Sequence, residues 1–302
     1  MTLAAGAVTP AAFADGLPIL SSDAGPRPAA AGPSICRSSA NPRIARRVGV
    51  AIQAALRGRR GTESVAVYDR RRGITCGVAS ARRYDSASVI KATILGATLR
   101  RAGEKHRALT RTEKALTHKM ITRSDNGAAS SLWRSLGRTR MQRFLNLAGM
   151  RRTRLGPGGY WGLTQITASD QVRLLGLFTG PNRVLSDKGR AYALALMNRV
   201  IPSQRWGTPA GRPGGVRWHV KNGWLPRKGR YWRVHSIGAF GRGYMIVVLT
   251  QDTPTMKYGI GTIERVARGV HRELNPDRRS ITSESAPGLV PEVSDGSVPP
   301  NL

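Results

Sequence analysis

Acidic residues and long apolar runs are scarce in this sequence. Only 17 of 302 residues are Asp or Glu, against 49 Lys and Arg, which gives a net charge of +32. No run approaches the roughly 18 apolar residues of a membrane-spanning helix, so no membrane span is expected in the mature protein. Hydrophobic residues make up 40% of the chain. This content and length fit a globular protein with a substantial core.

Cysteine is nearly absent, and histidine is scattered. The two cysteines, Cys36 and Cys76, and the 5 histidines lack the spacing of metal ligands, so neither a metal site nor a cofactor is expected. In an exported protein, an even pair of cysteines can form one disulfide. If the strand after the first helix runs back alongside it, the next strand begins near the helix start. Cys76 then approaches Cys36, and a disulfide between them is reasonable.

Arginine supplies most of the positive charge, because only 8 of the 49 basic residues are lysine. Clusters at 57–60, 70–72 and 151–152 would attract nucleic acid, acidic lipid headgroups or an anionic cell-wall polymer. No base-stacking pattern, zinc-finger spacing or phosphate loop accompanies them, which argues against nucleic-acid binding. A coding bias toward Arg, Ala, Gly and Pro explains scattered arginines equally well. An anionic wall polymer stays a candidate partner.

Both ends of the chain differ from its middle. Residues 1–40 are rich in Ala, Pro, Gly and Ser, and their apolar opening ends in a small-residue Ala-Phe-Ala sequence. We expect a disordered export remnant and linker there, and therefore a secreted or cell-envelope protein. Residues 275–302 are polar and rich in Pro and Ser, which favours disorder. The folded domain is expected over residues 41–274.

Within that domain, the apolar periodicity predicts a helix, then two strands, a helical block, three strands and a last helix. Asn41 is expected to cap the first helix, and 64–70 and 74–80 to form a hairpin. The helical block, about 87–200, includes a capping box at Thr110. The late strands are expected at 216–221, 231–240 and 244–250, and the last helix at 254–274. This order predicts an α/β fold, an antiparallel sheet flanked by N- and C-terminal helices plus an inserted all-helical subdomain.

A serine and a lysine stand three residues apart at the start of the helical block. In a helix, this spacing puts Ser88 and Lys91 on one face, one turn apart. A serine hydroxyl becomes a good nucleophile when a neighbouring base takes its proton, and a lysine serves as that base when its pKa is lowered. The alternative is that Ser88 only caps a buried helix while Lys91 faces solvent.

Three short motifs decide between these two interpretations. They are Ser-Val-Ile-Lys at 88–91, Ser-Asp-Asn at 124–126 and Lys-Asn-Gly at 221–223, opening a helix, lying in an interhelical loop and lying on a late strand. In this order they resemble the active-site-serine β-lactamase and penicillin-binding superfamily, most closely class A β-lactamases and their actinobacterial relatives. The resemblance covers roughly residues 41–274 and implies the β-lactamase-like fold.

The resemblance implies a role for each motif residue. Ser88 would attack a carbonyl to form an acyl-enzyme, with Lys91 taking or relaying its proton. Ser124 would pass that proton to the leaving nitrogen, helped by the ammonium of Lys221, and Asn126 would contact the substrate amide. The two lysines side by side should lower each other's pKa, which favours a neutral lysine base.

The late strands would complete the substrate site. The backbone N–H of the nucleophile and of Trp224, after Gly223, would form the oxyanion hole. Asn222 stands where the family carries Thr or Ser, so carboxylate recognition is expected to differ. Arg233 or His235 is a candidate for binding a substrate carboxylate; a structural cation facing solvent is the equal alternative.

Two further departures concern the helical block. The interval from Ser88 to Ser124 is short for class A, which implies a trimmed subdomain. The loop glutamate that activates the deacylating water in class A enzymes is missing, because residues 155–167 contain no carboxylate. Gln165 is no base, and Asp170 is better explained as a helix-cap residue. Acylation is therefore expected, and deacylation lacks its usual base.

Three functions fit these observations. The first is an exported class A β-lactamase-like serine hydrolase acting on a β-lactam or a related amide or ester. The second is a peptidoglycan D-alanyl carboxypeptidase or transpeptidase, which suits the missing glutamate and the cationic surface. The third is a cationic envelope-binding protein without turnover.

Overall fold

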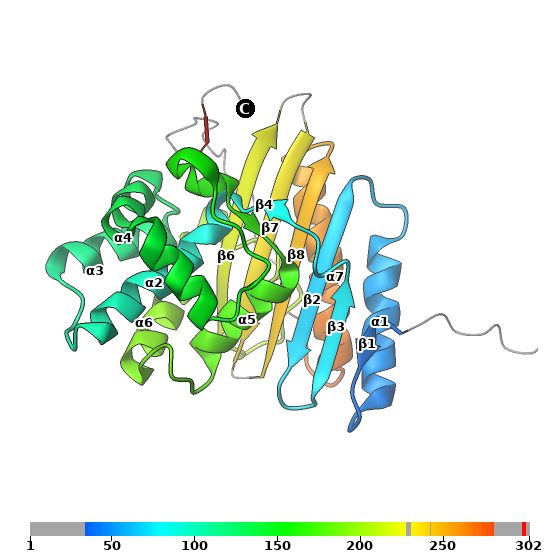
Figure 1. The fold of residues 1–302 in the computed structure, drawn as a ribbon. Coiled ribbons are helices and arrows are strands. Elements are labelled where there is room, and N and C mark those ends of the chain that lie inside the picture. Colours follow the sequence, from blue (N-terminus) through cyan, green and yellow to red (C-terminus); the bar gives the residue numbers. More distant parts are fainter. Residues whose placement is uncertain (1–33, 228–230, 242, 281–297, 300–302) are drawn as a thin grey trace, which may run out of the picture. The chain divides into compact units, whose positions relative to one another are not determined.

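An antiparallel sheet of six strands forms the centre of the protein, in the order β1-β3-β2-β8-β7-β6. The structure is a computed structural model and describes residues 34–227, 231–241, 243–280 and 298–299. The sheet contains β1 (Cys36–Arg37), β2 (Thr62–Asp69), β3 (Ile74–Val78), β6 (Trp218–Arg227), β7 (Tyr231–Phe240) and β8 (Tyr244–Thr253). A small second sheet pairs β4 (Tyr84–Asp85) with β5 (Gln165–Ile166). Figure 1 shows the larger sheet running from β6 to β1.

Helices cover both faces of the large sheet. The α-helices of the described residues are α1 (Pro42–Leu56), α2 (Ile90–Glu104), α3 (Arg111–Thr122), α4 (Asn126–Leu147), α5 (Ala168–Thr179), α6 (Asp187–Asn198) and α7 (Met256–Leu274). Of these, α2, α3 and α4 pack against one another beside the sheet. Figure 1 shows α1 and α7 together on one face and α5 on the other. This arrangement confirms the predicted α/β fold. Among the described residues, no helix has the length and apolar character to cross a bilayer.

The sequence of β8 shows why the sheet is covered on both sides. Side chains alternate between faces along a strand, and nearly every residue of β8 is buried. Ile246 and Val248 pack in the core under α1 and α7. Val247 and Leu249 pack in the core shared with the helical block. A central strand that is apolar on both faces therefore requires two helical layers.

The N-terminal part confirms the helix, the hairpin and the disulfide. The Sγ atoms of Cys36 and Cys76 are bonded, and the two residues face each other in the register of β1 and β3. Strand β1 precedes Asn41, where order was expected to begin, so the first ordered element was missed. Asn41 is at the N-cap position of α1, but its amide donates to the carbonyl of Arg72 at 3.1 Å and makes no cap bond.

The helical block contains the expected elements, and the tail needs one correction. Thr110 and Glu113 form the predicted capping box of α3. Gly137, with φ +69° and ψ 163°, breaks α4 into two helices. At the C-terminus, residues 275–280 are described, and Ser280 makes a β-bridge with Pro213. The expected disorder of 1–33 and 281–297 lies outside the described residues.

Two buried histidines are expected to make the fold sensitive to acid. His235 and His271 are at most 1% exposed, and burial lowers the pKa of each to about 4. The unfolded chain takes up these protons near pH 6.5, whereas the folded protein does so only near pH 4. The free energy of unfolding should therefore fall as pH drops from 6.5 to 4, by roughly 3 kcal/mol for each histidine.

Urea unfolding at several pH values between 4 and 7 measures this loss. His271→Gln should flatten the pH dependence, and His118→Gln, at an exposed position on α3, should leave it unchanged. Equal pH dependence in all three proteins would contradict the assignment to buried histidines.

Candidate active site

Ser88 lies in a single 3₁₀ turn, Ala87–Val89, which joins β4 to α2. Ala87 has φ +44°, a left-handed conformation that costs a non-glycine residue on the order of 1–3 kcal/mol. The glycine-rich loop at residues 155–166 holds the turn in place, because Ser86 N–H donates to the carbonyl of Thr164 at 2.8 Å. The buried hydroxyl of Ser86 donates to the carbonyl of Trp161 at 3.3 Å. Val89 is the N-cap of α2, so Ser88 is not the residue that caps this helix.

Lys91 points into the protein and is fully buried. Its Nζ donates to Ser88 Oγ at 2.9 Å and to Ser124 Oγ at 3.2 Å. It also donates to the Ser124 carbonyl and to Asn126 Oδ1, and it lies 4.9 Å from the centre of the Trp161 ring. The solvent-facing alternative for Lys91 is therefore wrong. The lysine is within proton-transfer distance of the proposed nucleophile.

Ser124 links the two lysines of the site. It lies between α3 and α4 with φ +59°, and Lys221 Nζ donates to its Oγ at 2.9 Å. The next residue, Asp125, caps α4 by accepting from Ala128 N–H at 2.7 Å. The strained conformation of Ser124 and the cap together aim its hydroxyl between Lys91 and Lys221. A continuous polar chain thus runs from Ser88 Oγ through Lys91 and Ser124 to Lys221.

Lys221 comes from β6, the edge strand of the sheet. Its side chain is 1% exposed, and burial lowers the pKa of its amine to about 7. Besides Ser124, its Nζ contacts the carbonyl of Asn222 at 2.8 Å. Desolvation favours the neutral amine, so Lys221 changes its charge close to neutral pH.

The charge of Lys221 should set the alkaline limb of the acylation rate. From the resemblance, its ammonium is expected to assist proton delivery through Ser124, so the rate should fall as pH rises above about 7, where the amine becomes neutral. Lys221→Arg should lower the acylation rate at about pH 7. Because a guanidinium stays charged, the rate of this variant should then stay constant up to about pH 9 or beyond. Stopped-flow acylation by penicillin G from about pH 5 to about pH 10 measures this. An unchanged alkaline limb in Lys221→Arg would contradict the assignment.

The turn that carries Ser88 touches β6 at Gly223. A Cβ added there would lie 2.8 Å from Val89 N and 3.0 Å from Ser88 N, closer than real Cβ atoms normally approach. Only glycine therefore allows the strand to lie against this turn. As an edge strand, β6 directs every second N–H away from β7. This contact brings the backbone before Trp224 next to the Ser88 N–H, where the oxyanion hole is expected.

The structure does not bring the Asn222 side chain to Ser88. Its amide donates to the carbonyls of Gln204 at 2.9 Å and Trp206 at 3.0 Å. Neighbouring side chains of a strand point to opposite faces, and Trp224, on the same face as Asn222, packs against Trp206. Asn222 therefore supports the strand from behind, and its side chain is not in the candidate site.

Neither cation of β7 is free for a substrate carboxylate. Arg233 pairs with Asp252 at 2.8 Å and lies 3.8 Å from Asp85. His235 is fully buried and its Nε2 donates to the Asp85 carbonyl at 2.8 Å. With a pKa lowered to about 4 by burial, His235 is neutral at pH 7. Both residues support the segment before Ser88 and are not brought to the nucleophile.

The candidates for a hydrolytic base are used elsewhere. The Gln165 amide donates to Asp85 Oδ1. The Asp170 carboxylate accepts from Arg152 N–H at 2.9 Å and from Thr153 Oγ1 at 2.8 Å. These bonds connect the segment at 152–153 to the start of α5. Asp170 N–H in turn donates to Thr167 Oγ1 at 3.2 Å, within the N-terminal turn of that helix. Neither side chain is free to act as a base, and the absence of the usual deacylating base stays a prediction.

Sequence reasoning missed three residues that support the nucleophile. Asp85 is buried beside the turn. Its carboxylate accepts a hydrogen bond from the Gln165 amide and lies 3.3 Å from the Arg227 guanidinium. Trp161 presents its ring to Lys91, and its Nε1 donates to Ser130 Oγ at 3.0 Å. The third, Ser86, is described above. The sequence offered one signal, a tryptophan inside a glycine-rich loop, which is an unusual place for a large apolar side chain. Asp85 and Ser86 carry no such signal, because their partners are remote in sequence.

A serine in contact with a buried lysine, and a second serine that bridges to another buried lysine, are the arrangement expected of a serine hydrolase that acts on amide bonds. The sequence profile of the β-lactamase enzyme family matches residues 110–274. This is more than half of the chain, and it includes Ser124 and Lys221. The chain therefore belongs to the β-lactamase enzyme family. No curated protein matches it in sequence.

Solved structures share the fold at low identity. A class A β-lactamase from Bacteroides cellulosilyticus has a TM-score of 0.69 at 17% identity, over 80% of this chain and 100% of that one. A β-lactamase from Sphaerobacter thermophilus has 0.63 at 20%, over 76% and 96%. A single-residue mutant of PBP-A, in an acyl-enzyme complex with penicillin G, has 0.63 at 20%, over 76% and 96%. These similarities establish the fold.

Proposed function

We propose that this protein is an exported serine hydrolase that is acylated on Ser88 by a β-lactam or a related amide or ester. One observation carries the proposal. Lys91 Nζ lies 2.9 Å from Ser88 Oγ, and Ser124 Oγ lies 3.2 Å from Lys91 Nζ and 2.9 Å from Lys221 Nζ. A nucleophile, its base and a proton route to the leaving group are thus in contact before any substrate binds.

The acylation step follows from this chain of contacts. With its amine neutral, Lys91 accepts a hydrogen bond from the Ser88 hydroxyl instead of donating one, and takes that proton while Oγ attacks the carbonyl carbon and the carbonyl oxygen becomes an oxyanion. The N–H groups of Ser88 and Trp224 would hold that oxyanion. The C–N bond then breaks, Ser124 gives its proton to the leaving nitrogen, and Lys91 returns a proton to Ser124. The products are the ester on Ser88 and a neutral amine, so atoms and charges balance.

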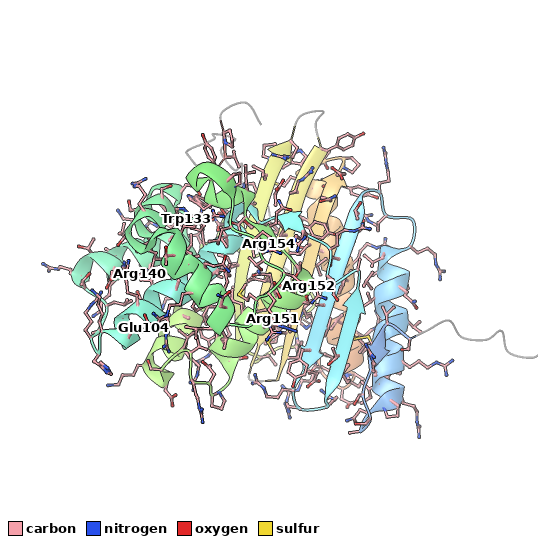
Figure 2. The ribbon with its side chains drawn as sticks, viewed as in Figure 1. Glu104, Trp133, Arg140, Arg151, Arg152 and Arg154 are labelled. Carbon is pink, nitrogen blue, oxygen red and sulfur yellow. A yellow bond between two sulfur atoms is a disulfide. The ribbon has the colours of Figure 1, made fainter. Side chains whose placement is uncertain are left out.

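Deacylation is proposed to be slow, because residues 155–167 contain no carboxylate and Asp170 is held by Arg152 and Thr153. This observation favours a second candidate, a peptidoglycan D-alanyl carboxypeptidase or transpeptidase. Arginines beside the loop suit an anionic cell-wall substrate or polymer. Arg151, Arg152 and Arg154 are exposed, and Figure 2 shows them one below another on the side of the molecule facing the viewer.

Product assays with matched substrates test the proposal. The protein is incubated with penicillin G and, separately, with a peptide ending in D-alanyl-D-alanine, and penicilloate and D-alanine are quantified. A Ser88→Ala variant is the control. Penicilloate above the control identifies a β-lactam hydrolase, and D-alanine identifies the peptidoglycan enzyme. If neither product forms, neither substrate leaves an acyl adduct on the wild type, and Ser88→Ala binds wall polymer as well as the wild type, the third function, a non-catalytic envelope-binding protein, replaces both.

A further inference from the structure

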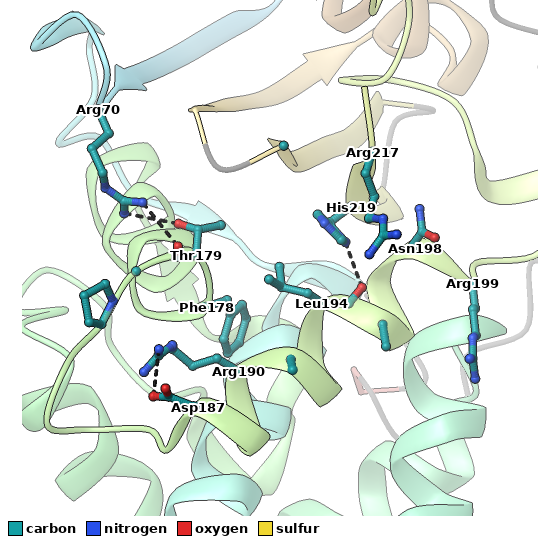
Figure 3. A pocket seen from close by; sticks show the side chains of 15 residues that line it. Arg70, Phe178, Thr179, Asp187, Arg190, Leu194, Asn198, Arg199, Arg217 and His219 are labelled. Atoms are coloured by element: carbon teal, nitrogen blue, oxygen red, sulfur yellow. Dashed lines mark hydrogen bonds and ion pairs between the residues drawn. The ribbon is translucent and has the colours of Figure 1, made fainter. Parts of the chain in front are cut away.

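A second cleft lies away from Ser88, between α5, α6 and the start of β6. It has a volume of about 1090 Å³, and its lining shares no residue with the polar chain from Ser88 to Lys221. Figure 3 shows Arg70 and Arg217 on opposite sides, with Phe178 between them. This volume is slightly above the range of about 300–1,000 Å³ typical of small-molecule sites. The cleft is therefore large enough for an extended ligand.

Positive charge dominates the cleft. Four arginines and one carboxylate line it: Arg70, Arg190, Arg199, Arg217 and Asp187. Asp187 is already paired with Arg190 at 2.8 Å, and its side chain is 91% exposed. A concave surface of one sign raises the local concentration of counter-ions more than scattered surface charges do. The cleft should therefore attract anions more strongly than arginines scattered over the rest of the surface do.

Two of these arginines are available to a ligand. Arg199, after the end of α6, and Arg217, just before β6, are exposed. Their guanidinium groups make no side-chain hydrogen bond or ion pair with other residues that the structure describes. A guanidinium presents a planar fork that matches two oxygens of a phosphate group. Arg70, by contrast, uses two nitrogens on Thr179, at 3.2 Å and 3.3 Å.

The wall between these arginines contains a buried histidine and apolar side chains. His219 is 4% exposed, and its Nδ1 must donate to the Leu194 carbonyl, 2.8 Å away, because a carbonyl only accepts. Nε2 is then unprotonated while the histidine is neutral. Burial, and to a smaller extent the charge of Arg217, lowers the pKa of His219. An anion beside Nε2 would raise that pKa, and the protonated Nε2 would then donate a hydrogen bond to the anion.

We propose that this cleft binds a ligand carrying two or more phosphate groups, held by Arg199 and Arg217. Each of the two available guanidiniums can engage one phosphate group through its planar fork, and the apolar wall around Phe178 and Leu194 accepts the part that links the phosphates. The phosphates could belong to a free polyphosphorylated molecule or to a phosphodiester chain, as in an anionic wall polymer. The site is separate from the acylation chemistry proposed for Ser88.

Calorimetric titration tests the proposal with two probes, inorganic tripolyphosphate and a glycerol-phosphate hexamer, in about 0.15 M salt, where exposed charges farther apart than about 8 Å are screened. Arg199→Glu/Arg217→Glu should weaken binding by at least about tenfold, because two favourable charge contacts become repulsive. The matched control is Arg43→Glu/Arg46→Glu, two exposed arginines on α1. It changes the net charge equally and should alter affinity by less than about twofold.

Each outcome decides the matter. Tighter binding of the hexamer assigns the cleft to a polymer strand, and tighter binding of tripolyphosphate assigns it to a free polyphosphate. A ligand-induced rise in the pKa of His219, followed by NMR, places the probe in this cleft. If neither probe binds, or both double variants weaken binding equally, there is no specific site and the proposal is overturned.

Discussion

Lys91→Met is expected to slow acylation of Ser88 by about 10²–10⁴-fold, the contribution typical of a positioned general base. Lys91 Nζ hydrogen-bonds Ser88 Oγ at 2.9 Å, so the amine is placed to take the proton of the nucleophile. Methionine has a similar volume without the amine, so the buried space stays filled while the base is lost. The second-order rate constant for adduct formation with penicillin G measures the effect.

The control for this variant is Lys105→Met, at the exposed C-cap of α2. It makes the same substitution at the other end of the same helix, and should acylate at the wild-type rate. Thermal unfolding shows whether each variant is folded. A folded Lys91→Met that acylates within about tenfold of the wild type would remove Lys91 from the role of base.

Gly223→Ala is expected to reduce the acylation rate by about 10²–10³-fold, the cost of losing one oxyanion-hole donor. The new Cβ would lie 2.8 Å from Val89 N and 3.0 Å from Ser88 N. Both are backbone atoms, so β6 and the turn must separate, and the N–H of Trp224 moves away from that of Ser88. Overpacking of this kind also costs about 1–3 kcal/mol of stability.

Gly176→Ala provides the comparison, because an added Cβ in α5 meets no atom within 4 Å. Alanine in a helix interior is favoured over glycine by roughly 1 kcal/mol, so this variant should be at least as stable as the wild type and acylate normally. If Gly223→Ala acylates as fast as Gly176→Ala, the close contact of β6 with the turn does not shape the oxyanion hole.

The framework of the site could be predicted from sequence because its signals are local. The spacing of Ser88 and Lys91 is a helix-turn spacing, and the Thr110–Glu113 capping box and the alternating strands each depend on a few neighbouring residues. The order of these elements was enough to predict the sheet, the helices on both of its faces and the disulfide. Motif order then identified Ser124 and Lys221, which the fold brings together across 97 residues.

The remaining parts depend on contacts that no local pattern records. The Asp85 contacts to Gln165 and Arg227 and the hydrogen bond of Ser86 to Thr164 join segments far apart in sequence. The direction of the Asn222 side chain was readable, because a residue next to Lys221 on a strand must face the other side of the sheet. The family motif suggested a substrate contact instead, and strand alternation outweighs that analogy.

Time-resolved intact mass spectrometry with penicillin G tests the central claim most directly. Acylation should add the mass of one intact penicillin to the wild type, at a peptide containing Ser88. The adduct should persist, because the loop before α5 offers no carboxylate to activate a deacylating water. Ser88→Ala should show no adduct at any time. A wild-type protein that never gains this mass, or a Ser88→Ala variant that gains it equally, would contradict acylation on Ser88.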